Sequence, residues 1–184
     1  MIEVRFHGRG GQGGVTSAEM LAIAAINEGK YAQAFPSFGP ERRGAPVIAF
    51  ARVSDRKIRN RTKVYHPDIV VVLDPSVLKI VNVEDGLKED GVLVINSAKS
   101  VAELRQDYGF KTALARVDAT RIAMEELGLP ITNTTMLGAL VKANGLIAVD
   151  SLVGPLEHRF GRIAARNIKA MQRAYQETEV AGKE

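Results

Sequence analysis

The order of apolar and polar residues predicts a chain in which strands alternate with helices. Residues 2–7 alternate between the two kinds, as a half-buried strand does. Residues 15–28 are rich in Ala, Met, Leu and Ile and end at Gly29, which predicts a helix. Because this helix is apolar nearly all round, we expect it to be well buried. The continuous apolar runs 69–73 and 92–96 are typical of parallel strands that are covered on both faces.

Weaker patterns add further elements between these. Three more strands are predicted at residues 31–34, 47–53 and 111–117, and a fourth at 57–64 is expected to pair with 47–53 across a turn. The predicted helices are a short one opened by Asp74 and Pro75, 100–107, a helix from the cap Asp118 to residue 127, 134–144, 151–158 and 159–177.

Together these elements predict a Rossmann-like α/β fold. We expect a mainly parallel sheet flanked by helices, with an antiparallel excursion around residues 46–64. Residues 1–177 are expected to form a single α/β domain, because a chain of 184 residues leaves little room for two cores. The last residues, 178–184, are expected to form a frayed tail.

The composition excludes several kinds of chemistry. The chain has no cysteine, so it cannot form a disulfide, a thiolate zinc site or a cysteine-ligated iron–sulfur cluster by itself. With three histidines and no HExxH or EF-hand pattern, no metal site is expected. Aromatic residues make up 5% and tryptophan is absent, so no nucleic-acid role is expected. Without a signal peptide or an apolar run of about 18 residues, we expect a cytoplasmic protein with no membrane contact.

The net charge of +4 is unevenly distributed. Residues 41–63 hold eight basic and two acidic residues, which gives this segment a charge of +6 and leaves −2 for the rest of the chain. A local excess of this kind attracts a phosphate-bearing ligand or an acidic partner.

A glycine-rich segment joins the first strand to the first helix. It matches GxGxxG, in which the backbone turns tightly and the helix start offers free N–H groups to an anion. The dinucleotide-binding version needs an acidic residue about 20 positions later, and residues 31–36 contain none. Three interpretations stay open: contact with an anion or another polar group, binding of NAD in spite of the missing acidic residue, or glycines that only allow close packing. The candidate contact residues are Gly8, Arg9, Gly10, Gly11, Gln12 and Gly13.

The loop after the second strand is another candidate site. Proline and glycine are too frequent in residues 35–46 for a regular element, and long loops often carry function. Arginines in a rigid loop suit a carboxylate, a phosphate or a neighbouring subunit, whereas the alternative is a surface loop with a local ion pair. The sequence does not decide which arginine is functional. The candidate residues are Ser37, Phe38, Gly39, Pro40, Glu41, Arg42, Arg43 and Gly44.

Other polar residues have both a functional and a structural interpretation. Asn133 and Thr134, at a helix start, either contact a ligand or cap the helix. His7 is expected to be structural. The last predicted helix carries a basic stripe that is either a solvated face or a docking face for an acidic partner or a phosphate, with Arg162 and Arg166 as candidate contacts. The stripe comprises Arg159, Arg162, Arg166, Lys169 and Arg173.

Four motifs in this order resemble a known family. They are GGQG at residues 10–13, FGPERRG at 38–44, HPD at 66–68 and NTTMLGA at 133–139. With them the chain resembles, over about residues 2–175, the gamma subunit of the 2-oxoacid:ferredoxin oxidoreductases, the pyruvate and 2-ketoisovalerate enzymes. The pair GGQG and FGPERRG is far more specific than GxGxxG alone.

The resemblance implies a role in a multisubunit enzyme. That enzyme converts pyruvate, coenzyme A and oxidised ferredoxin into acetyl-CoA, carbon dioxide and reduced ferredoxin. Its thiamine diphosphate, Mg²⁺ and [4Fe–4S] clusters are implied to sit on alpha, beta and delta-type partner subunits, which agrees with the absence of cysteine here. No catalytic residue is implied for this chain, which would complete the assembly, with direct contact to coenzyme A left open.

Two other functions stay open beside this one. A free-standing oxidoreductase would bind NAD or FAD at the glycine loop, and titration of the isolated chain with dinucleotides would reveal it. A pure interaction module would use the same loop only to pack against a partner. The sequence specifies neither the 2-oxoacid nor the subunit stoichiometry.

Overall fold

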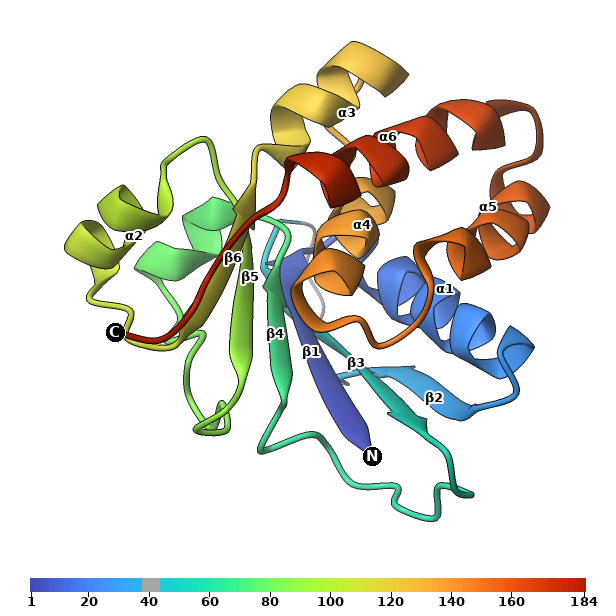
Figure 1. Cartoon of the computed structure of the whole chain (residues 1–184), viewed down its shortest axis with the longest axis horizontal. Coiled ribbons are helices and arrows are strands. Elements are labelled where there is room, and N and C mark those ends of the chain that lie inside the picture. Colours follow the sequence, from blue (N-terminus) through green and yellow to red (C-terminus); the bar gives the residue numbers. More distant parts are fainter. Residues whose placement is uncertain (38–43) are drawn as a thin grey trace.

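The computed structural model describes residues 1–37 and 44–184, and these form a sheet with helices on both faces (Figure 1). In this part of the chain the sheet has seven strands in the order β2-β3-β1-β4-β5-β6-β7. The strands are β1 (Ile2–Arg9), β2 (Tyr31–Pro36), β3 (Pro46–Ser54), β4 (Ile69–Val72), β5 (Val92–Asn96), β6 (Ala113–Val117) and β7 (Glu179–Ala181). The helices are α1 (Gly14–Asn27), α2 (Val101–Tyr108), α3 (Ala119–Leu127), α4 (Asn133–Asn144), α5 (Val153–Phe160) and α6 (Ala164–Glu177), with 3₁₀ turns η1 (Pro75–Lys79), η2 (Val149–Leu152) and η3 (Gly161–Ile163).

The centre of the sheet is parallel and its outer strands are antiparallel. β1, β4, β5 and β6 pair in parallel, whereas β3 runs antiparallel to β1, β2 runs antiparallel to β3, and β7 runs antiparallel to β6. The predicted α/β fold with a mainly parallel sheet and an antiparallel excursion is therefore confirmed.

Two hydrophobic cores lie on the two faces of the sheet. The larger core packs the sheet against α1, α3, α4, α5 and α6, and the smaller one packs it against η1 and α2 (Figure 1). The apolar runs in β4 and β5 serve both, because Val71 and Val94 face the larger core while Val70 and Leu93 face the smaller one. All four side chains are fully buried or nearly so.

The predicted strand at residues 57–64 is wrong. β3 lies between β1 and β2, so neither of its edges is free to receive another strand. The segment instead runs as irregular chain over the sheet, where the guanidinium of Arg52 donates to the carbonyl oxygens of Asn60, Thr62 and Lys63 at 3.4, 2.7 and 3.3 Å. A buried cation thus satisfies the backbone that a strand partner would have satisfied.

The predicted fraying of residues 178–184 is also wrong in its first half. Thr178 is buried and its hydroxyl donates to the carbonyl oxygen of Ala174 at 2.6 Å, which turns the chain out of α6. Residues 179–181 then pair with β6 as β7. The sheet edge offers unpaired backbone groups that the tail satisfies, and this is a tertiary effect that no local pattern announces.

The predicted helix 159–177 is interrupted at its start. Gly161 has φ 50° and ψ −116°, which ends α5, and a 3₁₀ turn leads into α6. Arg159 therefore belongs to α5 and Arg162 to η3, so the five basic residues do not lie on one continuous helix.

Candidate functional site

The glycine loop, residues 8–14, lies at the point in the sheet where the order of the strands reverses. It follows β1, from which the chain goes first to β2 and β3 on one side and later to β4, β5 and β6 on the other. In open α/β sheets, ligands bind at the carboxyl ends of strands at such a switch point. The ends of β4 and β5 bring Asp74 and Asn96 to the same edge.

Gln12 joins the glycine loop to the end of β4. Its side-chain Oε1 accepts from the backbone N–H of Arg9 and its Nε2 donates to the Asp74 carboxylate, both at 2.6 Å. Asp74 also caps η1, as predicted, by accepting from the Ser76 N–H at 2.8 Å. Burial opposes ionisation of Asp74, but the hydrogen bonds from Ser76 and Gln12 outweigh it and hold its pKa below the ordinary value. The loop is therefore braced by an ionised carboxylate.

Arg9 ties the glycine loop to the second candidate loop. Its Nε donates to the Ser76 hydroxyl at 2.8 Å, and its Nη1 donates to the Gly44 carbonyl oxygen at 2.9 Å. The backbone N–H of Gly10 donates to the Ala45 carbonyl oxygen at 2.9 Å. Of the candidate residues 37–44, Ser37 and Gly44 are thus placed, while Phe38, Gly39, Pro40, Glu41, Arg42 and Arg43 lie outside the described residues.

Gly13 is required by the packing of the loop on α4. A Cβ atom on Gly13 would lie 2.5 Å from Nδ2 of Asn133, and the φ of 77° also favours glycine. The hydroxyl of Ser17 adds a hydrogen bond to the Asn133 carbonyl oxygen at 3.1 Å. This glycine therefore allows the close approach of two segments that are far apart in the sequence.

Asn133 and Thr134 do not cap α4. The helix has no side-chain cap, and the hydroxyl of Thr134 instead donates to Oδ1 of Asn167 on α6 at 2.8 Å. Oδ1 of Asn133 and the hydroxyl of Thr135 are buried without a hydrogen-bond partner among the described residues. The capping interpretation is wrong because both side chains turn into the protein rather than back to their own helix start.

Small cavities flank the glycine loop. One of about 110 Å³ lies at the start of α1 beside Val47, and another of about 170 Å³ lies between the loop and residues 130–133. α1 has neither a side-chain cap nor an acidic residue in its first turn, so its positive end is open to an anion. The volumes suit a phosphate group but fall below the roughly 300 Å³ of an ordinary ligand pocket.

The arrangement of strands also argues against a dinucleotide site. In the dinucleotide fold, the second strand lies next to the first and carries the acidic residue that binds the ribose. Here β3 separates β2 from β1, and β2 is antiparallel to β3. Among the described residues, therefore, no second parallel strand brings a carboxylate to the place beside the glycine loop where the ribose would bind.

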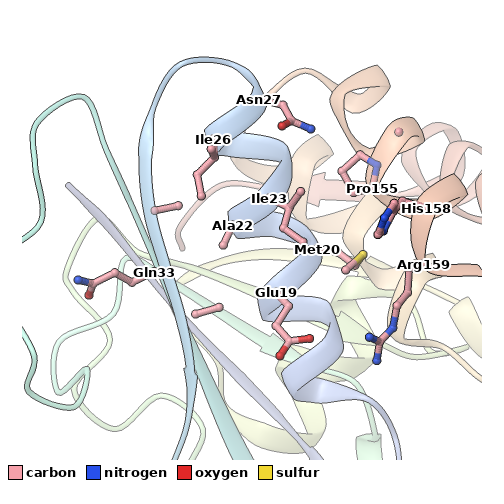
Figure 2. Close-up of a pocket in the computed structure, with 13 residues that line it drawn as sticks. Glu19, Met20, Ala22, Ile23, Ile26, Asn27, Gln33, Pro155, His158 and Arg159 are labelled. Atoms are coloured by element: carbon pink, nitrogen blue, oxygen red, sulfur yellow. The ribbon is translucent and has the colours of Figure 1, made fainter.

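A larger cavity of about 710 Å³ lies away from the loop, between α1, β2 and α5 (Figure 2). The prediction that this helix is well buried holds for one side of α1 only, because the side chains of Ile23 and Ile26 are 41% and 52% exposed on this face. Sequence reasoning missed this groove, and the only signal for it was an apolar helix with no polar face. The groove is lined by Glu19, Met20, Ala22, Ile23, Ile26, Asn27, Ala32, Gln33, Ala34, Gly154, Pro155, His158 and Arg159.

The basic stripe divides into two parts. Lys169 and Arg173 form ion pairs with Glu126 at 2.9 and 3.0 Å, and Arg173 also pairs with Glu125 and Glu177. These hydrogen bonds raise the pKa of Arg173. Arg159, Arg162 and Arg166 are exposed, with no carboxylate within 4.0 Å in residues 1–37 and 44–184.

Two features are absent from the described residues. No three His, Asp or Glu side chains in this part of the chain are grouped so that they could hold a metal ion. None of its helices combines the length and the apolar character that a membrane span requires.

The family model for pyruvate ferredoxin/flavodoxin oxidoreductase matches residues 3–177. The chain belongs to this family. It is 54% identical, over 98% of both chains, to the pyruvate/ketoisovalerate oxidoreductases common subunit gamma of Pyrococcus abyssi. It is 51% identical, over 97% of both, to the pyruvate synthase subunit PorC of Methanothermobacter thermautotrophicus. The crystal structure of the pyruvate oxidoreductase subunit PORC of Thermotoga maritima matches 98% of both chains at 40% identity, with a TM-score of 0.88.

These matches confirm the resemblance that GGQG and FGPERRG predicted. They extend over nearly the whole length of chains described as gamma or PorC subunits, so family membership is not limited to a shared motif. The same matches place this chain with subunits of oxidoreductase complexes. They argue against the free-standing oxidoreductase that the sequence of the glycine loop had left open.

Proposed function

We propose that this chain is the gamma-type subunit of a 2-oxoacid:ferredoxin oxidoreductase of the pyruvate synthase type. The observation that carries the proposal is the match along 98% of both chains to a common gamma subunit at 54% identity. The reaction is pyruvate, coenzyme A and oxidised ferredoxin to acetyl-CoA, carbon dioxide and reduced ferredoxin. Thiamine diphosphate, Mg²⁺ and the [4Fe–4S] clusters are assigned to alpha, beta and delta-type partners, and the whole complex to the cytoplasm.

The geometry of the glycine loop supports a structural rather than a catalytic role. The side chains of Arg9, Gln12 and Asp74 are hydrogen-bonded within this chain: Gln12 to the Arg9 N–H and to Asp74, and Arg9 to the Ser76 hydroxyl and the Gly44 carbonyl oxygen. These bonds occupy the polar groups of the three side chains, whereas a general acid or base has to come within hydrogen-bond distance of a substrate atom. The braced loop instead fixes Gly44, at the end of the candidate loop, through Arg9.

Direct contact with coenzyme A is a second role, favoured by one feature. The uncapped start of α1 and a cavity of about 110 Å³ lie beside the anchored end of the 37–44 loop, which holds Arg42 and Arg43. Free N–H groups and arginines are the groups that bind phosphate, and coenzyme A carries three phosphates.

Reconstitution of the complex tests the main proposal. The tagged chain is co-expressed with the alpha, beta and delta-type subunits of its own organism and purified without oxygen. We expect thiamine diphosphate, iron and coenzyme A-dependent reduction of ferredoxin by pyruvate to appear with the tagged chain, and activity to be lost when this chain is omitted. A tagged chain that elutes alone, with the other subunits active without it, overturns the proposal.

A double substitution tests the loop in the same complex. Arg42→Ala/Arg43→Ala should raise the KM for coenzyme A or weaken assembly by about tenfold, while Arg56→Ala, an exposed arginine outside the loop, serves as the matched control. Unchanged assembly, turnover and KM would show that these arginines have neither role, without affecting the assignment of the chain to the complex.

A further inference from the structure

The groove between α1, β2 and α5 has an apolar floor that the described residues of this chain leave open. Met20 and Ile23 of α1 point towards Pro155 and α5, whereas Ile26 lies on the side of α1 that is next to β2 (Figure 2). Ile23 and Ile26 are separated by one helical turn and expose about half of their surface. An apolar stripe along a helix is normally buried against another element, so its exposure indicates a missing partner.

The neighbouring edge of the sheet is open as well. β2 is the outermost strand on this side, and its residues, YAQAFP, carry no charge. Edge strands are normally protected by charged residues or by shortness, because their free backbone groups pair with other chains. The opposite edge shows such protection, since β7 has three residues and Glu179 on it pairs with Arg116 at 2.7 Å.

The polar end of the groove is basic. His158 and Arg159 line it, and the exposed Arg162 and Arg166 follow on η3 and α6. Glu19 is the one acidic residue among those that line the groove, and it lies at the same end as Arg159 (Figure 2). Arg159, Arg162 and Arg166 form no ion pair in the described chain, in contrast to Lys169 and Arg173, so positive charge remains in excess at this end. An occupant with a carboxylate at this end would complement it.

We infer that this groove seats a segment of another subunit of the same complex, a segment that places apolar side chains on Ile23 and Ile26 and a carboxylate at Arg159. The inference rests on the proposed function, which supplies the other subunits. A second copy of this chain fits less well, because it would bring the same excess of positive charge to the shared interface and no surplus carboxylate.

Photo-crosslinking in the assembled complex tests the occupant directly. Asn27, an exposed residue on the rim of the groove, is replaced by p-benzoylphenylalanine during co-expression with the other subunits. The matched control places the same residue at Met124, a 48% exposed apolar position on α3. We expect at least tenfold more crosslinking from position 27, to an apolar segment of another subunit next to an Asp or Glu. Crosslinks to a second copy, or no excess over position 124, overturn the inference.

Charge substitutions test the same surface by assembly. Ile23→Glu/Ile26→Glu and, separately, Arg159→Glu should reduce the amount of the other subunits that co-purifies at least tenfold, whereas Met124→Glu should not. Circular dichroism of each variant checks that it is folded. If the wild-type chain fails to assemble, the proposed function fails. If it assembles and the groove variants assemble equally well, only the docking inference is wrong.

Discussion

On the face of the sheet opposite α1, the two halves of the sheet bury different kinds of side chain. We call these halves the β7 side and the β2 side. β1 and β4 are parallel neighbours in which Arg5 pairs with Val70 and His7 pairs with Val72. Buried polar side chains therefore lie next to buried apolar ones between these two strands. On the β7 side, which comprises β4 to β7 with η1 and α2, this face is apolar. On the β2 side, which comprises β1 to β3 and residues 55–68, the same face buries Arg5, His7 and Arg52.

This difference determines what holds each side together. The β7 side is covered by regular elements whose apolar side chains bury one another. On the β2 side, guanidinium groups hold irregular segments by their carbonyl oxygens: Arg52 donates to Thr62 at 2.7 Å, and Arg5 reaches the segment before β5, donating to Val83 and Asp85 at 2.9 and 2.6 Å. The β2 side therefore depends on a few buried charges, and it is also the side whose outer edge and helix face are open to a partner.

The largest predicted effect is the loss of Arg52. Its side chain is fully buried, pairs with Glu3 at 2.7 Å and lies 5.1 Å from the ring of Phe35. Arg52→Leu leaves the Glu3 carboxylate and the carbonyl oxygens of residues 60–63 without a donor, so we expect it to lower the free energy of unfolding by about 3–5 kcal/mol. Urea denaturation measures this loss, and limited proteolysis should cut first within residues 57–63.

An apolar truncation on the β7 side provides the comparison. Ile95 is fully buried in β5, and Ile95→Val should cost only about 0.5–1.5 kcal/mol, because neighbouring side chains partly fill the space. If Arg52→Leu costs no more than Ile95→Val, the irregular segment is not held by the guanidinium, and the contrast between the two sides does not hold.

Apart from β7, whose pairing with β6 no local pattern indicates, the sequence predicted the β7 side better than the β2 side for a physical reason. The helix starts at Asp74 and Asp118, like the buried runs of β4 and β5, are decided by residues within a few positions of each other. The β2 side is decided at long range. Residues 57–64 have a strand-like pattern, but the sheet has no free edge there and Arg52 takes their carbonyl oxygens.

The candidate site also has features that local motifs predicted and features that depend on long-range contacts. GGQG identified the loop at the switch point and, with FGPERRG, the family. The brace between Gln12 and Asp74 spans 62 positions, and the packing of Gly13 on Asn133 spans 120, so no spacing rule could reveal them. The groove was missed because its apolar residues look like core residues, and only the absence of a covering element shows that they face outward.

Removal of β7 should have a smaller effect than loss of Arg52. A chain ending at residue 177 loses the pairing of β7 with β6, the Thr178 hydrogen bond to Ala174 and the contact of Arg105 with the Gly182 carbonyl oxygen. We expect a loss of about 1–2 kcal/mol, since several partly exposed hydrogen bonds each contribute little. The freed edge of β6 should also cause aggregation, measured by light scattering. A truncated chain as stable and monomeric as the full chain would indicate that β7 does not seal this edge.

The smallest predicted effect is a pH dependence that arises on the β2 side. Burial, with a smaller contribution from the charge of Arg5, lowers the pKa of His7 to about 3 from the ordinary 6.5. Between these values the unfolded chain binds a proton that the folded chain does not, so stability falls as the pH drops from about 6.5 towards 3. The slope should reach at most about 1.4 kcal/mol per pH unit.

The variant His7→Leu should remove that part of the slope. Nε2 of His7 is buried with no hydrogen-bond partner among the described residues, so an apolar side chain of similar size does not break a bond there. We expect His7→Leu to equal the wild type near pH 8 and to exceed it by about 1 kcal/mol at pH 5.5. His66→Asn, at an exposed position, controls for the loss of a histidine as such. If the stability curves of His7→Leu and the wild type run parallel from pH 8 to 5, the imidazole of His7 is hydrated in the folded chain. The buried polar face would then not distinguish the β2 side from the β7 side.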